Sequence, residues 1–249
     1  MSAPLQIEQV PVALLAGGLG TRLGAVAQQM PKALVDVGGK PFIDHQMLLL
    51  RRNGIRRVVI CLGHLGEQIQ HHLGDGSDLG MHLEYSHDGP RPLGTGGAVR
   101  AALDRLGQVF WVMYGDSYMD IDYPAILAHF DRNGAAALMT VIRNDNRWDR
   151  SNVIFSDGRL LRYDKTHPTA DMNFIDYGAA LLRRETMHDM PADHAFDLAD
   201  LYTRLVAQGR MIGYEVTRRF YEIGTAQSLE ETRQYFKAPD VHPGLPKDG

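Results

Sequence analysis

Short apolar runs alternate with segments of helical periodicity over most of the chain. The apolar runs that we expect to form strands cover residues 10–16, 58–62, 109–114, 137–142 and 177–182. The segments that we expect to form helices cover residues 42–53, 67–73, 98–106, 123–133, 196–208 and 228–236. This order predicts an α/β domain in which helices cover both faces of a mixed, mostly parallel central sheet.

The stretch 144–176 interrupts the alternation. Its segments 152–155 and 160–163 flank Ser156-Asp157-Gly158-Arg159, and an Asp-Gly pair between short apolar segments is typical of a β-hairpin. We therefore expect a small antiparallel excursion from the sheet in this part of the chain.

The same pattern predicts a single domain at residues 10–236. Residues 1–9 would precede it as an N-terminal extension. Residues 237–249 contain three prolines and little that could pack, so we expect a disordered tail. A chain of 249 residues is long enough to bury the core of one such domain.

Composition argues against several classes of function. The formal net charge of −4 is unlike that of most nucleic-acid-binding proteins, which are basic. The single cysteine, Cys61, excludes an internal disulfide framework, and its apolar neighbours indicate an inert core thiol. No apolar run approaches the length of a membrane span, and the N-terminal residues do not resemble a secretory signal. We therefore expect a cytoplasmic protein with no membrane or nucleic-acid partner.

A glycine-rich loop follows the first apolar run. The sequence Leu14-Leu15-Ala16-Gly17-Gly18-Leu19-Gly20-Thr21-Arg22-Leu23 has three glycines in four positions, and Pro31-Lys32 lies downstream. Glycine lets a backbone approach a ligand closely, so successive N–H groups can converge on one anion. Arg22 and Lys32 add two cations. The loop therefore predicts a binding site for a polyphosphate.

Two other phosphate-binding motifs fit these residues less well. A P-loop requires Lys-Ser or Lys-Thr after its glycines, and neither pair follows here. The dinucleotide fingerprint requires Gly-x-Gly-x-x-Gly, but Leu23 stands where the last glycine belongs. A turn that binds no ligand is the remaining alternative.

Three later motifs accompany the loop. They are Pro92-Leu93-Gly94-Thr95-Gly96-Gly97-Ala98, Gly115-Asp116-Ser117 and Phe220-Tyr221-Glu222-Ile223-Gly224-Thr225. In this order, the four motifs resemble the signature of the sugar-1-phosphate nucleotidylyltransferases, and the resemblance spans residues 10–236. It implies a Rossmann-like nucleotidyltransferase domain that uses a nucleoside triphosphate, a sugar 1-phosphate and Mg²⁺, and that releases pyrophosphate.

The resemblance assigns the triphosphate to the first loop. The nucleotide-binding residues that it implies there are Leu15, Ala16, Gly17, Gly18, Gly20 and Thr21. The substrate brings its own ionised nucleophile, so the enzyme's task is to align two anions and to stabilise the developing charge. Arg22 can hold pyrophosphate in a bidentate fork, and Lys32 can act as a point charge near the α-phosphate. With Asp116, these two are the expected catalytic residues.

Asp116 is also the leading candidate for a metal ligand. It follows the apolar run 109–114, and open α/β sheets bind their ligands at the carboxyl ends of the strands. Mg²⁺ prefers one or two carboxylates together with phosphate oxygens and water. The resemblance implies Glu222 as the second carboxylate, where relatives more often carry aspartate. Asp120 and Asp122 read as parts of a turn and a helix entry, so we rank them lower.

A second glycine-rich segment precedes the helix expected at 98–106. It lacks cations, so contact with a nucleobase is more natural there than contact with phosphate. The resemblance implies that Gly94, Thr95, Gly96 and Gly97 line the base, with backbone groups at its edge. The form of this segment is most similar to guanylyltransferases acting on manno-heptose or mannose 1-phosphate, which favours GTP; UTP and CTP stay open as alternatives.

Candidate acceptor residues lie in and after the excursion. Lys165 matches the family's sugar-phosphate lysine, although Thr166 replaces the usual proline, and Tyr177 with Gly178 matches a sugar-contacting segment. Three further residues could face the sugar: Trp148, Arg150 and Asn152. The histidines show no metal-binding spacing, but His64, after the second expected strand, could approach the nucleotide.

Two other functions stay open at this point. The acceptor could be another small phosphoester, such as phosphocholine, or the chain could be a non-catalytic relative that binds nucleotide as a regulatory subunit. The presence of Arg22, Lys32 and Asp116 favours catalysis. The expected partners are small-molecule substrates, and assembly into a homo-oligomer is left open.

Overall fold

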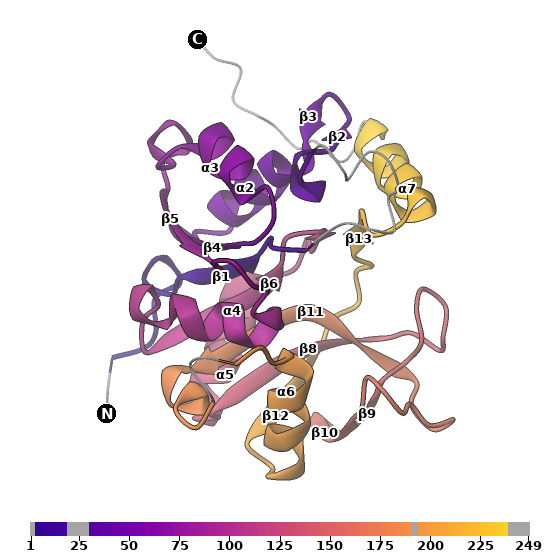
Figure 1. The fold of residues 1–249 in the computed structure, drawn as a ribbon. Coiled ribbons are helices and arrows are strands. Elements are labelled where there is room, and N and C mark those ends of the chain that lie inside the picture. Colours follow the sequence, from indigo (N-terminus) through magenta and orange to yellow (C-terminus); the bar gives the residue numbers. More distant parts are fainter. Residues whose placement is uncertain (1–2, 19–29, 191–193, 239–249) are drawn as a thin grey trace.

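A nine-stranded sheet forms the centre of the computed structural model, with helices on both of its faces (Figure 1). The structure describes residues 3–18, 30–190 and 194–238. The strands of this sheet are β1 (Val12–Leu15), β4 (Arg57–Leu62), β5 (His82–His87), β6 (Val109–Tyr114), β8 (Ala137–Arg143), β9 (Val153–Ser156), β10 (Arg159–Tyr163), β11 (Phe174–Arg183) and β12 (Met211–Glu215). Residues 239–249, most of the tail that we expected to be disordered, lie outside the described part.

Parallel pairing dominates one half of the sheet, in the order β6-β1-β4-β5. Strand β11 runs antiparallel to both β6 and β8, and β12 pairs with β8 in parallel. The hairpin β9–β10 joins the sheet at the first residue of β11, where Phe174 pairs with Val153 of β9. The expected mixed, mostly parallel sheet is thus confirmed, and so is the antiparallel excursion.

Five of the six described α-helices pack against the main sheet in two groups. The bounds of all six are α2 (Phe42–Arg52), α3 (Gly66–Leu73), α4 (Gly94–Ala102), α5 (Tyr123–Asn133), α6 (Leu198–Ala207) and α7 (Ala226–Lys237). Short 3₁₀ turns occur at η1 (Ile7–Gln9), η3 (Lys32–Leu34), η4 (Ser77–Leu79), η5 (Leu103–Arg105) and η6 (Arg184–Met187). Apolar residues of α2, α3 and α5 share one buried cluster with the sheet, and those of α4 and α6 share a second. None of the described helices is both long and apolar enough to cross a membrane.

The central strands are apolar throughout because both of their faces are covered. In β1, Val12 and Leu14 belong to the cluster with α2, whereas Ala13 belongs to the cluster with α4. In β4, Ile60 belongs to the cluster with α2, and Cys61 belongs to the cluster with α4. Cys61 is buried, as expected of a core thiol, and burial raises its pKa to about 12.

Helix α7 brings the end of the described chain back beside β2 (Asp36–Val37) and β13 (Tyr221–Glu222). A third apolar cluster joins Leu229 and Phe236 of α7 to Val37 of β2 (Asp36–Val37) and to Tyr118 of β7 (Ser117–Tyr118). Two small sheets support this cluster: β2 pairs with β3 (Lys40–Pro41), and β7 pairs with β13 (Tyr221–Glu222). Figure 1 shows α7 in yellow beside this part of the fold. The helix ends at Lys237, one residue beyond the expected boundary.

One helix begins earlier than expected. We placed its start at residue 98, after a glycine-rich loop, but α4 already begins at Gly94. Two strands of the nine-stranded sheet were missed: β5 carries charged and polar residues, and β12 has only five residues, so neither shows a long apolar run. The two-residue strands β2, β3, β7 and β13 were missed as well.

Candidate active site

A cavity of about 690 Å³ lies where β1, β4 and β6 end. Residues 15–18 after β1, Gly63 and His64 after β4, and Gly115 and Asp116 after β6 contribute to its lining. Because the three strands are parallel neighbours, their carboxyl ends meet at one edge of the sheet. The ends of these strands therefore place the expected nucleotide-binding residues 15–18, His64 and the expected metal ligand Asp116 around one space.

The floor of the cavity is made of closely packed backbone. A Cβ atom on Gly63 would lie 2.5 Å from the carbonyl oxygen of Gly17, and one on Gly115 would lie 2.9 Å from that of Leu15. The N–H of Ala16 donates to Cys61 at 2.9 Å. Side chains are excluded where these segments touch, so peptide groups line this side. Leu15, Ala16, Gly17 and Gly18 all line the cavity.

Three residues of the expected phosphate loop cannot be placed. Gly20, Thr21 and Arg22 lie outside the described residues. Their roles in binding the triphosphate stay predictions from the sequence.

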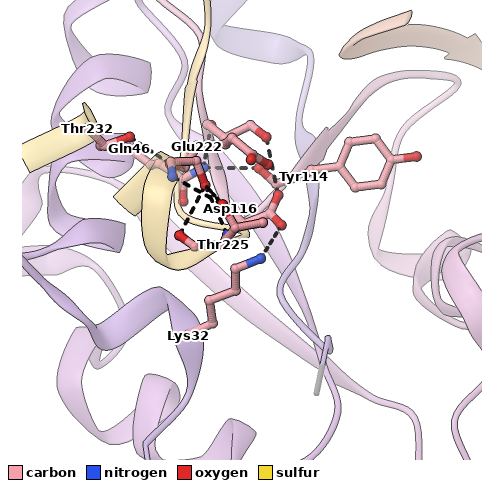
Figure 2. A network of polar contacts seen from close by, with 9 residues as sticks. Lys32, Gln46, Tyr114, Asp116, Glu222, Thr225 and Thr232 are labelled. Atoms are coloured by element: carbon pink, nitrogen blue, oxygen red, sulfur yellow. Dashed lines mark hydrogen bonds and ion pairs between the residues drawn. The ribbon is translucent and has the colours of Figure 1, made fainter. Parts of the chain in front are cut away.

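An ion pair joins the expected catalytic lysine to the expected metal ligand. The Lys32 ammonium lies 2.6 Å from Oδ2 of Asp116, and both residues line the cavity (Figure 2). The side chains are 13% and 32% exposed, so the pair is shielded from solvent on one side and open to the cavity on the other. Lys32 begins the 3₁₀ turn η3, and Asp116 lies between β6 and β7. The structure thus brings together two charged groups that are far apart in the sequence.

Glu222 reaches the same place through β13. Its backbone is paired with that of Ser117 in β7, and the N–H of Ile223 donates to the carbonyl oxygen of Asp116 at 3.0 Å. The hydroxyl of Thr232 in α7 donates to the Glu222 carbonyl at 2.6 Å. Figure 2 shows Glu222 and Asp116 next to one another. The family motif that contains Glu222 therefore adjoins the motif that contains Asp116.

Asp116 lines the cavity, whereas Glu222 adjoins Asp116 through the β7–β13 pair without lining the cavity itself. In the part of the chain that the structure describes, no group of three or more His, Cys, Asp or Glu side chains could hold a metal ion. Mg²⁺ is held by one or two carboxylates when phosphate oxygens and water complete its shell. Asp120 is engaged elsewhere, with Arg52 and Arg218 at 2.8 Å each, and Asp122 caps α5 through Ala125. Asp116 and Glu222 stay the predicted ligands of such an ion.

The start of α4 forms the opposite wall. Gly94 and Thr95 line the cavity, but the backbone N–H groups of Gly96 and Gly97 donate to the carbonyl oxygen of Phe196, at 2.9 and 3.4 Å. These two N–H groups are therefore not free to read the edge of a base. Gly94 and Thr95 stay the candidates for that contact. Glycine is required at position 96 because the Phe196 ring packs against it.

We expect Gly96→Ala to lower the free energy of unfolding by about 1–3 kcal/mol, as overpacking does. A Cβ atom at this position would lie 2.1 Å from Cε2 of Phe196, so the ring and the adjoining start of α6 must move. Urea unfolding of this variant beside Gly18→Ala measures the effect, because a Cβ on Gly18 would meet no described atom within 4 Å. Equal stabilities would contradict this account.

The expected acceptor lysine lies beside α6. The Lys165 ammonium is 3.7 Å from Oδ2 of Asp197, whose Oδ1 accepts from the hydroxyl of Thr95 at 3.1 Å. Asp164 accepts from the N–H groups of Thr166 and His167, and these bonds hold its pKa near 2 and fix the turn after Lys165. Through Asp197, Lys165 is connected to the cavity wall.

Tyr177 and Gly178 occupy a bulge in β11. The register against β8 shifts between Asp176 and Ala180, and the N–H of Gly178 donates to Oδ1 of Asp176 at 3.0 Å. The Tyr177 side chain is buried against Phe220, so its ring belongs to the core. Of the three further candidates in the excursion, Asn152 binds the N–H of Asp176 at 3.0 Å, Trp148 packs on Phe220, and Arg150 is exposed.

Asp176 makes stability depend on pH. Burial raises its pKa to about 6, while the Gly178 N–H and the Lys165 charge act in the opposite direction. The folded protein therefore binds this proton more tightly than the unfolded chain does. The carboxyl favours the folded state most below its ordinary pKa of 3.8, and this contribution is lost as the pH rises through about 6.

We expect Asp176→Asn to raise the thermal midpoint at pH 7 by about 2–4 °C, for a gain of roughly 1 kcal/mol. The amide keeps an oxygen for the Gly178 N–H but carries no charge. Calorimetry from pH 4 to pH 7 should show the gain shrinking towards the acidic end. A gain independent of pH would contradict the raised pKa.

Sequence reasoning missed Asp88, which lines the cavity, and two polar residues beside it. Asp197 acts as the N-cap of α6, and an aspartate before a helical segment is the signal that could have found it. Gln46 stands among Phe42, Ile43, Met47 and Leu50, on the buried side of α2. A polar residue in an apolar stripe is the signal there. His64, as expected, lines the cavity.

Comparisons with known proteins agree with this geometry. A family model described as "Nucleotidyl transferase" matches residues 12–152. The N-acetylmuramate alpha-1-phosphate uridylyltransferase of Neisseria meningitidis serogroup B is 30% identical over 224 residues, which is 88% of this chain and 95% of that protein. The D-glycero-alpha-D-manno-heptose 1-phosphate guanylyltransferase of Campylobacter jejuni is 26% identical, over 78% and 87%.

Solved structures show the same fold. A putative glucose-1-phosphate thymidylyltransferase from Bacillus anthracis superposes with a TM-score of 0.84 at 19% identity, over 95% of this chain and 98% of that one. HddC from Yersinia pseudotuberculosis, in complex with GMP-PN, gives a TM-score of 0.76 at 24% identity, over 91% and 99%.

Proposed function

Since the chain belongs to the family of sugar-1-phosphate nucleotidylyltransferases, we propose that its cavity binds GTP and that its acceptor is a heptose or hexose 1-phosphate. An oxygen of the sugar phosphate attacks the α-phosphorus of the nucleotide. The bond between the α-phosphorus and the bridging oxygen breaks, and pyrophosphate leaves with the electron pair. The products are a nucleoside diphosphate sugar and pyrophosphate.

The observation that carries this proposal is the Lys32–Asp116 pair at the edge of the glycine-rich floor. The peptide groups of Gly17 and Gly18 supply neutral donors for a phosphate chain, and Lys32 supplies a positive charge in the same cavity. Charge that develops on phosphate oxygens is stabilised by such preorganised groups. The cavity thus combines a polyphosphate cradle with a cation placed for the reacting phosphate.

We propose Mg²⁺ as the divalent cation, held by Asp116 and Glu222. When bound, it would neutralise phosphate oxygens and help to orient the nucleotide. Lys32, which contacts Asp116, would also contact an oxygen of the α-phosphate. Its ammonium carries three donors, so it can contact two anions at once.

On the acceptor side, Lys165 would bind the phosphate of the sugar. The Asp197 carboxylate lies 3.7 Å from the Lys165 ammonium and accepts a hydrogen bond from Thr95, which lines the cavity. Asp197 therefore contacts both the lysine for the sugar phosphate and a residue of the nucleotide site. The peptide backbone at Tyr177 and Gly178 would face the sugar, since the tyrosine ring is buried. Alignment of the two substrates is worth several orders of magnitude in rate, because it removes their translational freedom.

A second nucleotide, UTP, is favoured by the comparison with the Neisseria relative. The Neisseria relative is named for N-acetylmuramate alpha-1-phosphate and for uridylyl transfer, and this chain covers 95% of its length. UTP with an N-acetylated hexose 1-phosphate is therefore the alternative to GTP. The Campylobacter relative, named for a heptose phosphate and guanylyl transfer, supports the first choice.

A pyrophosphate-release screen tests both. The four common nucleoside triphosphates are each combined with a panel of heptose, mannose, glucose and N-acetylmuramate 1-phosphates in the presence of Mg²⁺. We expect turnover with GTP and a heptose or hexose phosphate. Turnover restricted to UTP and N-acetylmuramate phosphate would replace GTP by the alternative. Silence of folded protein across the panel would reject the proposed substrates.

We also propose that the protein acts in the cytoplasm with small-molecule substrates. Nucleoside triphosphates are supplied there, and the cavity has the size of a site for small molecules. The division of the chain at residues 10 and 236, and assembly into a homo-oligomer, stay predictions.

A further inference from the structure

Gln46 spans the turn that presents Asp116 (Figure 2). Its side-chain nitrogen donates to the carbonyl oxygens of Tyr114 and Ser117, at 3.0 and 2.8 Å. Between these two carbonyls the chain contains Gly115 and Asp116 alone. The residue itself is 3% exposed, so these bonds lie beneath the cavity rather than in it.

The orientation of the Gln46 amide follows from its partners. Carbonyl oxygens only accept hydrogen bonds, so the NH₂ end must face the turn. Both of its hydrogens are then used. The other end, Oε1, is buried and has no hydrogen-bond partner among the described residues. A buried acceptor without a partner lowers stability, which a structure tolerates where the group has another use.

We propose that Gln46 is a positioning residue for Asp116. Its amide group binds the carbonyl oxygens on both sides of the turn and so fixes the direction in which the Asp116 carboxylate projects. This inference rests on the proposed function, because it assigns Gln46 to the residue that would hold the divalent cation.

Other bonds hold the turn from the remaining sides. Gly115 N–H donates to Leu15 at 2.9 Å, and the Asp116 carbonyl accepts from Ile223 at 3.0 Å. These are bonds of the backbone, which connect the turn to β1 and to β13. Gln46 adds the connection to α2. Without it, the carbonyls of Tyr114 and Ser117 would lose a shared donor, and the turn could widen around Asp116.

Removal of the amide should therefore act on the chemical step. A displacement of reacting groups by about 1 Å can cost about 10²-fold in rate. We expect Gln46→Met, which keeps the length of the side chain but has no donor, to lower kcat by about 10- to 100-fold. The KM for the sugar phosphate should stay within about twofold, because Lys165 lies on other elements. The Mg²⁺ concentration for half-maximal activity should rise.

The matched control is Leu50→Val. Leu50 is buried on the same helix, and its truncation loosens the core of α2 without touching the turn. Hydrogen exchange of the full chain without substrates supplies a readout that is independent of activity. Gln46→Met should speed exchange at residues 114–118 more than Leu50→Val does, while β1 exchanges alike in both. Gln46→Asn keeps a shorter amide and should lie between wild type and Gln46→Met; it serves if the methionine variant does not fold.

A kcat of Gln46→Met within twofold of that of Leu50→Val would overturn the inference. So would equal exchange at residues 114–118 in the two variants. If the wild type released no pyrophosphate with any substrate pair, the proposed substrates would fail instead. The exchange comparison would then still decide whether Gln46 holds the turn.

Discussion

Lys32→Ala should lower the rate of pyrophosphate release by about 10²–10³-fold, which corresponds to roughly 3–4 kcal/mol of transition-state stabilisation. The ammonium lies at the cavity wall, 2.6 Å from Asp116, in a position that is only 13% exposed. A positive charge in so shielded a place interacts more strongly with phosphate oxygens than an exposed one does. Steady-state kinetics with the substrate pair found in the screen measures the loss.

Lys40→Ala is the matched control for this prediction. It removes the same charge from an exposed residue of β3, away from the cavity, and should leave kcat unchanged. Lys32→Arg keeps the charge on a larger, planar group and should recover part of the lost rate. A rate of Lys32→Ala within threefold of wild type would remove Lys32 from its assigned role.

Asp116→Asn should lower kcat by about 10³-fold or more, since several kcal/mol of charge stabilisation depend on a bound divalent cation. A neutral amide is a poor ligand for Mg²⁺, and saturating Mg²⁺ should not restore the rate. The fold should survive, because the Asp116 backbone keeps its bond from Ile223 and Ser117 keeps its bond from Gln46. A Mg²⁺ titration of the initial rate measures both effects.

Asp120→Asn separates this role from a general effect of negative charge. Asp120 lies four residues further on and is paired with Arg52 and Arg218. Its substitution should cost less than threefold in rate. A similar loss in the two variants would contradict the assignment of Asp116. Because Lys32 and Asp116 touch, the double variant should lose less than the product of the two single losses.

The parts of the fold that were predictable are those that local sequence determines. Residues 109–114 form β6 with the expected bounds, because a strand buried on both faces is apolar at every position. The hairpin was also predictable: Asp157 and Gly158 both adopt positive φ, as a two-residue turn between antiparallel strands requires.

The start of α4 was not predictable in this way. Glycine is a poor helix former, so Gly94-Thr95-Gly96-Gly97 reads as a loop. The helix forms there because the Phe196 carbonyl, about a hundred residues later, accepts from the first N–H groups. Tertiary contact overrides local preference at this point.

Some residues of the candidate site were predictable from the sequence, and others were not. Lys32 and Asp116 stand in motifs, so the sequence pointed to both, and the structure places them in contact. Gln46 belongs to no motif, and its importance depends on two carbonyls that only folding brings near it. Asp197 likewise gains its contacts with Thr95 and Lys165 from the packing of α6 beside α4.

The pairing of β7 with β13 has a consequence for biosynthesis. Each of these strands has two residues, yet together they close a loop that contains every element from α5 to β12. Closing so long a loop is entropically unfavourable until the elements within it have condensed. On the ribosome, the nine main strands emerge before Glu222 does. The pairing that places Glu222 beside Asp116 is thus one of the last contacts that folding can form.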